Sequence, residues 1–212
     1  MLAHLATIFV TWFVVIDPPA MAPIFLTLTA GHPPEERKAT ALRAVTIAAL
    51  ILALFALTGQ HLLSVIGITI PALRISGGIL LLLLAREMVF ARQSGMRSTT
   101  HSEDREARER EDVGTFPLAI PLLAGPAAIT SSILLMEGAG DDRFLQAAVL
   151  GGMLVVLVLT YVLFISAARV MQRIGVTGIN VIGRALGIIL AALALQYVID
   201  GLAAAFPALV SG

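Results

Sequence analysis

The run Val14-Val-Ile-Asp17-Pro18-Pro19-Ala20-Met21-Ala-Pro-Ile-Phe25 places one acid and two adjacent prolines inside an otherwise apolar N-terminal stretch. Proline lacks a backbone N–H and clashes with the preceding helical turn, so a helix breaks there. About 15 residues at 1.5 Å each place the break near the middle of a hydrocarbon core of about 30 Å. The run therefore predicts a membrane-spanning helix that is interrupted near its middle.

The composition of the whole chain also indicates an integral membrane protein. Of 212 residues, 58% are hydrophobic and 13% are charged, and the formal net charge is zero. Soluble domains are about 45–50% apolar and about 25% charged. These values exclude a soluble enzyme, a disordered chain and a nucleic-acid-binding protein. The chain has no cysteine and its histidines lack metal-ligand spacing, so we expect no cofactor and no bound metal.

Six apolar stretches are long enough to cross the membrane, which takes roughly 20 helical residues. They cover residues 2–29, 40–64, 69–90, 115–136, 145–168 and 181–205. A polar loop of mixed charge at residues 92–114 separates the third stretch from the fourth. We interpret this loop as a solvated connector, with a docking or regulatory segment as the alternative. The predicted fold class is an all-α membrane protein with six transmembrane helices, of which the first and fourth are discontinuous.

The basic residues indicate the orientation. Only Arg143 lies on the side of the even-numbered joints, whereas the joints after the first, third and fifth stretches hold Arg37, Lys38, Arg43, Arg92, Arg97, Arg105, Arg108, Arg110, Arg169, Arg173 and Arg184. Basic residues concentrate on the cytoplasmic side of membrane proteins. We therefore expect a multi-pass protein of a bacterial or archaeal inner membrane, with both termini outside.

The two halves of the sequence carry similar motifs in the same order. A Gly-x-Thr motif begins at Gly67 and at Gly175, and each copy is followed by Arg-x-x-Gly and an aliphatic run. Asp17-Pro18 and Gly125-Pro126 lie 108 positions apart. Because each half holds three spans, the second copy would be inserted upside down, as in many secondary transporters. The predicted organisation is two inverted three-helix repeats, residues 1–91 and 115–212, joined by a cytoplasmic polar loop, residues 92–114.

The matching breaks predict two half-helices whose N-terminal ends face the centre of the protein. Proline is favoured at the first helical position, and a helix N-terminus carries free N–H groups and the positive end of the dipole. Two such ends suit a carboxylate, although the prolines could instead only kink two packed helices. The candidate substrate-binding residues are Asp17, Pro18, Pro19, Ala20, Met21, Ala124, Gly125, Pro126, Ala127, Ala128 and Thr130.

Asp17 is the strongest single candidate, because an ionisable group at membrane depth is costly and usually functional. A protonated carboxyl would carry a coupling proton, and an ionised carboxylate would bind a cation. The alternative is a structural N-cap of the second half-helix. The sequence leaves these readings open.

Three further residues receive structural or coupling roles. Arg74 lies inside the third stretch, where we expect it to pair with a carboxylate or a helix C-terminus. Arg184 lies near the inner end of the sixth stretch and is expected to extend its head group to the interface. Asn180, one turn earlier, is expected to cap that helix. Hydroxyl groups along the half-helices could touch substrate or bond back to helix carbonyls: Thr27, Thr130, Ser131 and Ser132.

Taken together, these motifs resemble the MarC family (UPF0056-type) of six-span membrane proteins. The resemblance extends from residue 17 to residue 201 and rests on residues 17–25, 70–78, 117–126 and 179–187, with Gln196 and Gly201. It implies an inner-membrane protein with discontinuous first and fourth helices. Because the family includes a neutral amino acid transporter, it also implies transport of small neutral amino acids such as glycine or alanine.

The chain departs from the family pattern at two positions. Ala20 stands where family members usually have glycine, and Ala127 follows Pro126 where glycine is frequent. Each added methyl group narrows the space at the start of a half-helix. The size and identity of the substrate therefore stay open.

The function expected from these features is secondary transport of a small neutral amino acid by alternating access, coupled to protons or sodium ions. The partners are then the amino acid, the coupling ion and the lipid bilayer, with no nucleic acid. The alternative is a small-ion or metal-ion permease or channel, for which Asp17 offers some support. We do not expect an enzyme, because no nucleophile–base pair and no H-E-x-x-H motif lies within a span.

Overall fold

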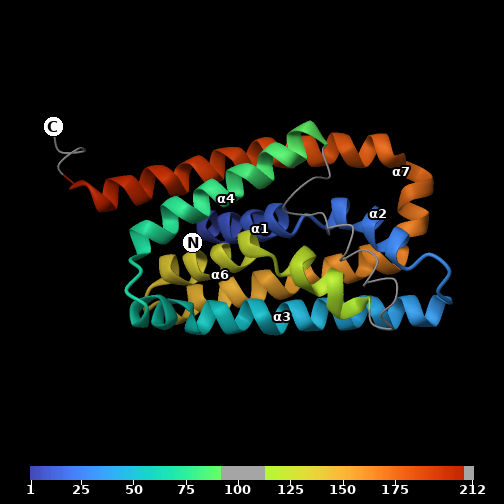
Figure 1. Cartoon of the computed structure of the whole chain (residues 1–212), viewed down its shortest axis with the longest axis horizontal. Helices are drawn as coiled ribbons and strands as arrows, with labels where there is room; N and C mark the ends of the chain where they lie inside the picture. Colours follow the sequence, from blue (N-terminus) through green and yellow to red (C-terminus); the bar gives the residue numbers. More distant parts are fainter. Residues whose placement is uncertain (92–112, 208–212) are drawn as a thin grey trace.

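The computed structural model describes residues 1–91 and 113–207, and these residues form helices without any β-strand (Figure 1). The elements in chain order are α1 (Leu2–Ile16), α2 (Pro18–Leu28), α3 (Pro34–Val65), α4 (Ile70–Phe90), η1 (Gly114–Leu123), α6 (Pro126–Ala139) and α7 (Arg143–Ala205). The predicted polar loop lies outside the described residues, except for Val113 and Gly114.

Several of these helices are apolar enough to lie in a membrane. By length and composition, three described segments pass as spans: α1 with α2, α3, and α7. A fourth is obtained when η1 and α6, which are bent by 57° at their junction, are counted as one broken span. The described chain is thus an all-helical membrane protein with several apolar helices.

The helix α7 is a long element with one break in its middle. Gly175 has φ 68° and ψ 173°, a conformation that L side chains rarely adopt, and the chain changes direction there. The predicted fifth and sixth stretches are the two parts of this element, residues 143–174 and 176–205. Figure 1 shows the second part running beside α4, whereas α3 lies along the opposite side of the molecule.

The fourth predicted stretch begins differently from the prediction. Residues 115–124 were expected to be helical, but Phe116 (φ −135°, ψ 128°) and Ile120 (φ −128°, ψ 124°) are extended. Each precedes a proline, whose ring disfavours the helical conformation of the residue before it. The segment η1 is therefore irregular, and the irregular backbone of this stretch begins well before Gly125.

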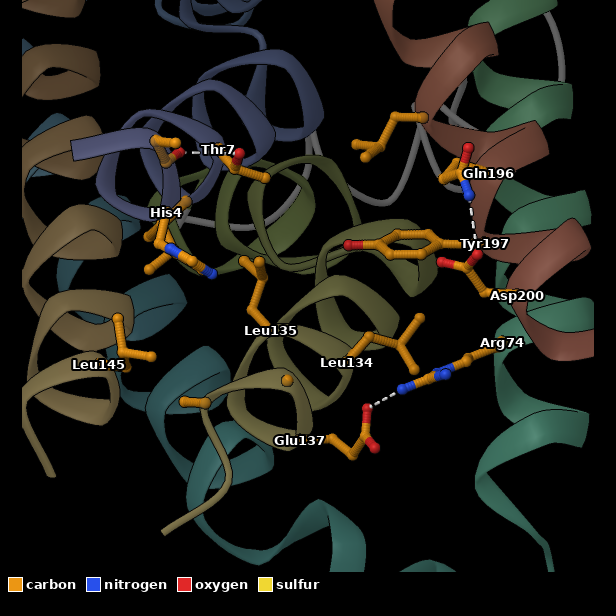
Figure 2. Close-up of a pocket in the computed structure, with 15 residues that line it drawn as sticks. His4, Thr7, Arg74, Leu134, Leu135, Glu137, Leu145, Gln196, Tyr197 and Asp200 are labelled. Carbon is orange, nitrogen blue, oxygen red and sulfur yellow. Dashed lines mark hydrogen bonds and ion pairs between the residues drawn. The ribbon is translucent and has the colours of Figure 1, made fainter. Parts of the chain in front are cut away.

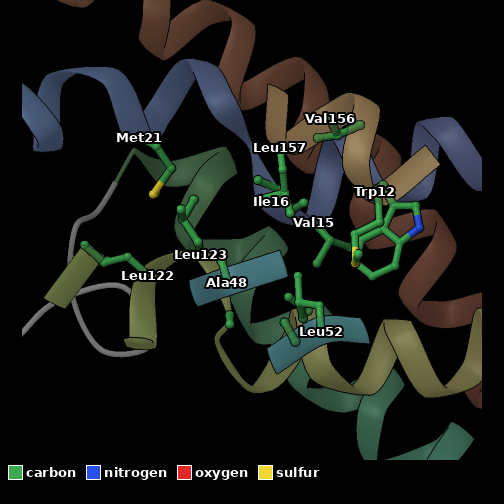
Figure 3. Packing of buried hydrophobic residues seen from close by; sticks show 14 of the residues in the cluster. Trp12, Val15, Ile16, Met21, Ala48, Leu52, Leu122, Leu123, Val156 and Leu157 are labelled. Carbon is green, nitrogen blue, oxygen red and sulfur yellow. The ribbon is translucent and has the colours of Figure 1, made fainter. Parts of the chain in front are cut away.

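The core is formed where α1 and α2 pack against α3, η1 and the first part of α7 (Figure 3). Trp12 is completely buried, and its indole N–H donates to the carbonyl oxygen of Val149 at 3.0 Å. Phe25 and Phe164 stack with ring centroids 4.5 Å apart. These contacts fix the broken first span against α7.

The helix α4 and the second part of α7 approach each other closely through small residues. A Cβ atom at Gly78 would lie 2.6 Å from the carbonyl oxygen of Ala194, and one at Gly187 would lie 2.9 Å from Cβ of Met88. Glycine at such contacts lets the backbones of membrane helices pack directly. The two helices therefore form one closely packed pair.

Candidate functional site

The break between α1 and α2 lies where the sequence predicts it, at Asp17. This residue has φ 52° and ψ 61° and is fully buried. Aspartate is one of the few residues apart from glycine that adopt the left-handed conformation readily. Its carboxylate makes no capping hydrogen bond to α2, so the structural N-cap reading receives no support.

The start of α2 differs from the predicted anion site in its backbone hydrogen bonds. The amides of Ala20 and Met21 donate to the carbonyl oxygen of Asp17 at 3.1 and 3.2 Å. Pro18 and Pro19 have no N–H group. The amides in the first turn of α2 are therefore already bonded to the backbone, and their binding of a substrate carboxylate stays a prediction.

Asp17 lines a cavity of about 200 Å³ between α2, the end of α4 and the second part of α7. We call it the Asp17 cavity; its walls are Asp17, Ala20, Met21, Ile24, Glu87, Met88, Ala91, Val176, Ile179, Asn180 and Gly183. It contains two carboxylates and one carboxamide. Such a set can hold an ammonium group, a cation or a proton.

The start of α6 is much more tightly packed. Gly125, the N-cap residue of α6, has φ −81° and ψ 174°. Together with Pro126, Ala127 and Ala128 it lines a cavity of only about 20 Å³, enough for about one water molecule. Ala124 is buried beside them. The start of α6 therefore has much less open space beside it than the start of α2, and a common site at the two starts stays a prediction.

The hydroxyl groups of the half-helices mostly bond to their own helices. Thr130 donates to the carbonyl of Pro126 at 2.8 Å, Thr27 to that of Pro23 at 3.0 Å, and Ser132 to that of Ile129 at 2.7 Å. Of the two readings that the sequence left open, back-bonding is therefore the observed one for these three residues. Ser131 is fully buried on α6.

The structure agrees with some of the predictions made for the three structural or coupling residues and differs from others. Arg74 pairs with Glu137 of α6 at 2.5 Å, which confirms the expected carboxylate partner. Asn180 lies within α7, more than one turn after the break at Gly175, so the expectation that it caps the helix is wrong. It lines the Asp17 cavity instead. Arg184 is exposed, as expected for a head group at the interface.

A further cavity, of about 400 Å³, was not anticipated from the sequence (Figure 2). We call it the Arg74 cavity; it lies between the start of α1, the start of α4, the end of α6 and both parts of α7. The Arg74–Glu137 pair forms part of its wall, and Asp200 accepts a hydrogen bond from the Gln196 amide at 2.7 Å. Asp200 could have been found from the sequence, because it is an ionisable residue inside the predicted sixth stretch.

The two cavities lie at opposite ends of the same helices. At 1.5 Å per residue, Thr7 of the Arg74 cavity is about 15 Å along the first span from Asp17. Along α4, Arg74 is about 20 Å from Glu87. Between these levels the side chains of Trp12, Ile16 and Leu81 are completely buried.

Comparison with known proteins identifies the family of the chain. Residues 2–206 match the family described as "MarC family integral membrane protein". The UPF0056 membrane protein YvbG of Bacillus subtilis is 37% identical over 212 residues, which is the whole of both chains. A UPF0056 membrane protein of Methanocaldococcus jannaschii is 39% identical over 193 residues, covering 90% of this chain and 91% of the relative.

A third relative, the UPF0056 membrane protein YhcE of Escherichia coli, is 32% identical over 207 residues, which cover 96% of this chain and 94% of the relative. No solved structure matches the chain. The relatives come from both bacteria and archaea, and each covers nearly the whole length of the sequence. The chain belongs to the MarC family of integral membrane proteins.

Proposed function

We propose that this protein is a secondary transporter that moves small neutral amino acids, such as glycine and alanine, across the inner membrane and couples this movement to a proton or sodium gradient. The observation that carries the proposal is the pair of cavities at opposite ends of α1 and of α4, with buried side chains between them. Alternating access requires a path that opens toward one side while a packed layer closes it toward the other. The proposal assigns no catalytic role to any residue.

The proposed architecture is six spans in two inverted three-helix repeats, and the element boundaries support it. The half-helices α2 and α6 begin at Pro18 and Pro126, 108 positions apart. The helix α3, residues 34–65, and the first part of α7, residues 143–174, are equally long and are offset by 109 positions.

The turns repeat with the same offset. Gly31 and Gly140 have positive φ angles of 89° and 52° and are 109 positions apart. Gly67 and Gly175 have φ angles of 75° and 68° and are 108 positions apart. Short apolar sequence motifs can recur by chance. Positive φ angles that recur at the same offset are separate evidence, and so they strengthen the case for a duplication.

The proposed orientation places both termini outside. Figure 1 shows the start of α1 and the end of α7 toward the same end of the molecule. The start of α3 and the bend between the two parts of α7 lie toward the other end (Figure 1). In the sequence, the basic residues Arg37, Lys38 and Arg43 belong to the first segment, and Arg169 and Arg173 precede the break at Gly175. The excess of positive charge at that end supports its assignment to the cytoplasm.

In this proposal the Asp17 cavity is the binding site on the cytoplasmic side. Asp17 and Glu87 give it two carboxylates, which suit the ammonium group of an amino acid or a coupling cation. Ala20 narrows the cavity at the start of α2, where glycine would leave more room. A small substrate is therefore favoured over a bulky one at this level.

The second candidate is a small-ion permease or channel, and the same two carboxylates are the observation that favours it. Among the described residues no group of three or more histidine, aspartate or glutamate side chains is arranged to hold a metal ion. A metal-ion permease thus gains no support from this part of the chain.

Reconstitution into proteoliposomes separates the two candidates. With labelled glycine or alanine outside, we expect uptake against a concentration gradient when an inward proton or sodium gradient is applied. Dissipation of that gradient with an ionophore should abolish accumulation. Ion flux without amino acid flux would reject the transporter assignment in favour of a small-ion permease or channel.

A further inference from the structure

The first part of α7 carries a stripe of exposed side chains that ends in two arginines. We call it the α7 stripe; its members are all exposed and are Leu154, Val158, Val162, Ile165, Arg169 and Arg173. Steps of three or four residues keep these positions on one face of a helix. The other face is buried in the protein, where Phe164 stacks on Phe25 of α2. The α7 stripe therefore faces away from the protein and toward lipid.

The two arginines lie at the depth of the lipid phosphates. The first part of α7, residues 143–174, has its middle near Val158. At 1.5 Å per residue, Arg169 lies about 16 Å and Arg173 about 22 Å beyond Val158 along the helix. The hydrocarbon core extends about 15 Å from the middle of the bilayer. When this helix is centred in the membrane, its two arginines thus reach the head groups while the aliphatic part of the stripe lies beside the acyl chains.

The positive charge of the α7 stripe is not offset by acidic side chains. Residues 143–199 contain no aspartate and no glutamate. In the part of the chain that the structure describes, neither Arg169 nor Arg173 forms an ion pair or a side-chain hydrogen bond. Glu35, which begins α3 at the same end of the molecule, pairs with Lys38. The two arginines are one helical turn apart, so both can reach one anionic group.

The opposite end of the same helix is built differently. Arg143 directly follows two acids, Asp141 and Asp142, and the carboxylate of Asp142 caps the start of α7. The charge of Arg143 is therefore offset by its neighbours in the chain, whereas the charges of Arg169 and Arg173 are not. The first part of α7 thus attracts anions at one end only.

We propose that the α7 stripe binds a phospholipid of net negative charge, such as phosphatidylglycerol, in the leaflet at the end of the molecule where α7 bends (Figure 1). Arg169 and Arg173 hold the phosphate, and one acyl chain lies along Ile165, Val162 and Val158. A zwitterionic lipid has the same phosphate, but its ammonium group cancels the charge that the arginines attract. Only the assignment of this leaflet to the cytoplasm rests on the proposed orientation, and lipid binding does not require transport.

Quenching of tryptophan fluorescence by brominated lipids tests the site on the full chain in nanodiscs. Ile165→Trp places a reporter one turn from Arg169, and Leu154→Trp places one on the same face toward the other leaflet. Trp12, the only native tryptophan, is buried and is common to both variants. The Ile165→Trp reporter should prefer phosphatidylglycerol to phosphatidylcholine at least about fivefold, and the Leu154→Trp reporter should show no preference. Equal preference at the two reporters would overturn the proposal.

Arginine variants locate the site. In the Ile165→Trp chain, Arg169→Gln combined with Arg173→Gln should remove the preference for phosphatidylglycerol, whereas Arg143→Gln should leave it unchanged. A preference that survives the loss of both arginines would place the lipid elsewhere. Soluble glycerol 3-phosphate carries the phosphate without an acyl chain and should not displace the lipid. Displacement would identify a free phosphate as the ligand and reject the lipid.

Native mass spectrometry of the unchanged protein decides the matter if a reporter variant fails to fold. From equal amounts of the two lipids, the protein should retain phosphatidylglycerol, and equal retention of both would reject the site. The outcomes also separate this inference from the proposed function. A lipid preference without amino acid uptake removes the transporter and leaves the lipid site, whereas uptake without a lipid preference removes the lipid site and leaves the transporter.

Discussion

The starts of α2 and α6, which the proposed repeat places at matching positions, are built differently. At Asp17 the backbone is left-handed, and the residue lines a cavity of about 200 Å³. At Gly125 the backbone is extended, and the cavity holds about 20 Å³. One half-helix start is therefore open and the other is closed, although the proposed repeat matches them.

This difference has a direct meaning for an inverted repeat. If the two halves can exchange conformations, the half that is now closed becomes open when the other closes, and access passes from one side of the membrane to the other. The asymmetry would then be a property of one state of the protein and not of the two sequences. Experiments on matched positions of α2 and α6 can separate these two explanations.

The largest effect is expected at Asp17. The Asp17→Asn substitution removes the charge and keeps a side chain that tolerates the left-handed backbone. Transport in proteoliposomes should fall at least about tenfold, whereas the unfolding temperature should change little. Transport that keeps its rate and its dependence on the ion gradient would show that Asp17 has no part in coupling.

An Asp17→Ala variant is the matched control for the backbone. Alanine lacks the charge, and the left-handed conformation costs it about 1–2 kcal/mol of conformational free energy. We expect the same loss of transport as in Asp17→Asn, together with a lower unfolding temperature. A fall in stability of the same size in both variants would assign the transport defect to folding.

Cysteine labelling compares the two half-helix starts directly, because the chain has no cysteine of its own. Ala20 lines the Asp17 cavity, and Ala127 is 5% exposed beside the cavity at Gly125. A small thiol reagent should modify Ala20→Cys about tenfold faster than Ala127→Cys, since the second site must open before it reacts. If the two halves exchange conformations, addition of a transported amino acid should raise one labelling rate and lower the other. Equal labelling rates without substrate would contradict the difference in openness between the two half-helix starts.

The positions of the breaks could be predicted from the sequence because they follow from local rules. Proline disrupts the helix that precedes it and is favoured at the start of the next, and these rules alone place α2 at Pro18 and α6 at Pro126. The same rule, applied to the residues before Pro117 and Pro121, would also have predicted the extended conformations in η1. That signal was present in the sequence and was missed.

The cavities could not be predicted, because they depend on contacts between distant residues. Arg74 and Glu137 are 63 positions apart, and no local pattern pairs them. The small number of backbone donors at the start of α2 has a local cause, because Pro18 and Pro19 have no N–H and the amides of Ala20 and Met21 bond to the carbonyl of Asp17. Sequence patterns thus located the half-helices but not what surrounds their ends.

The smallest expected effect tests how tightly the start of α6 is packed. A Cβ atom at Gly125 would collide with the carbonyl oxygen of Pro121, and backbone cannot move aside as a flexible side chain can. Gly125→Ala should therefore destabilise the protein by about 1–3 kcal/mol, a fall of about 2–4 °C in unfolding temperature for each kcal/mol.

Gly138 provides the control within the same helix, because a Cβ atom there meets nothing within 4 Å. Gly138→Ala should stabilise α6 by about 0.5–1 kcal/mol, since alanine restricts the unfolded chain more than glycine does. The two substitutions add the same methyl group to one helix and should shift the unfolding temperature in opposite directions. If Gly125→Ala is as stable as the unchanged protein, the backbone at the start of α6 can move to accommodate a methyl group. The difference in openness between the starts of α2 and α6 would then belong to one conformation of the protein and not to fixed packing.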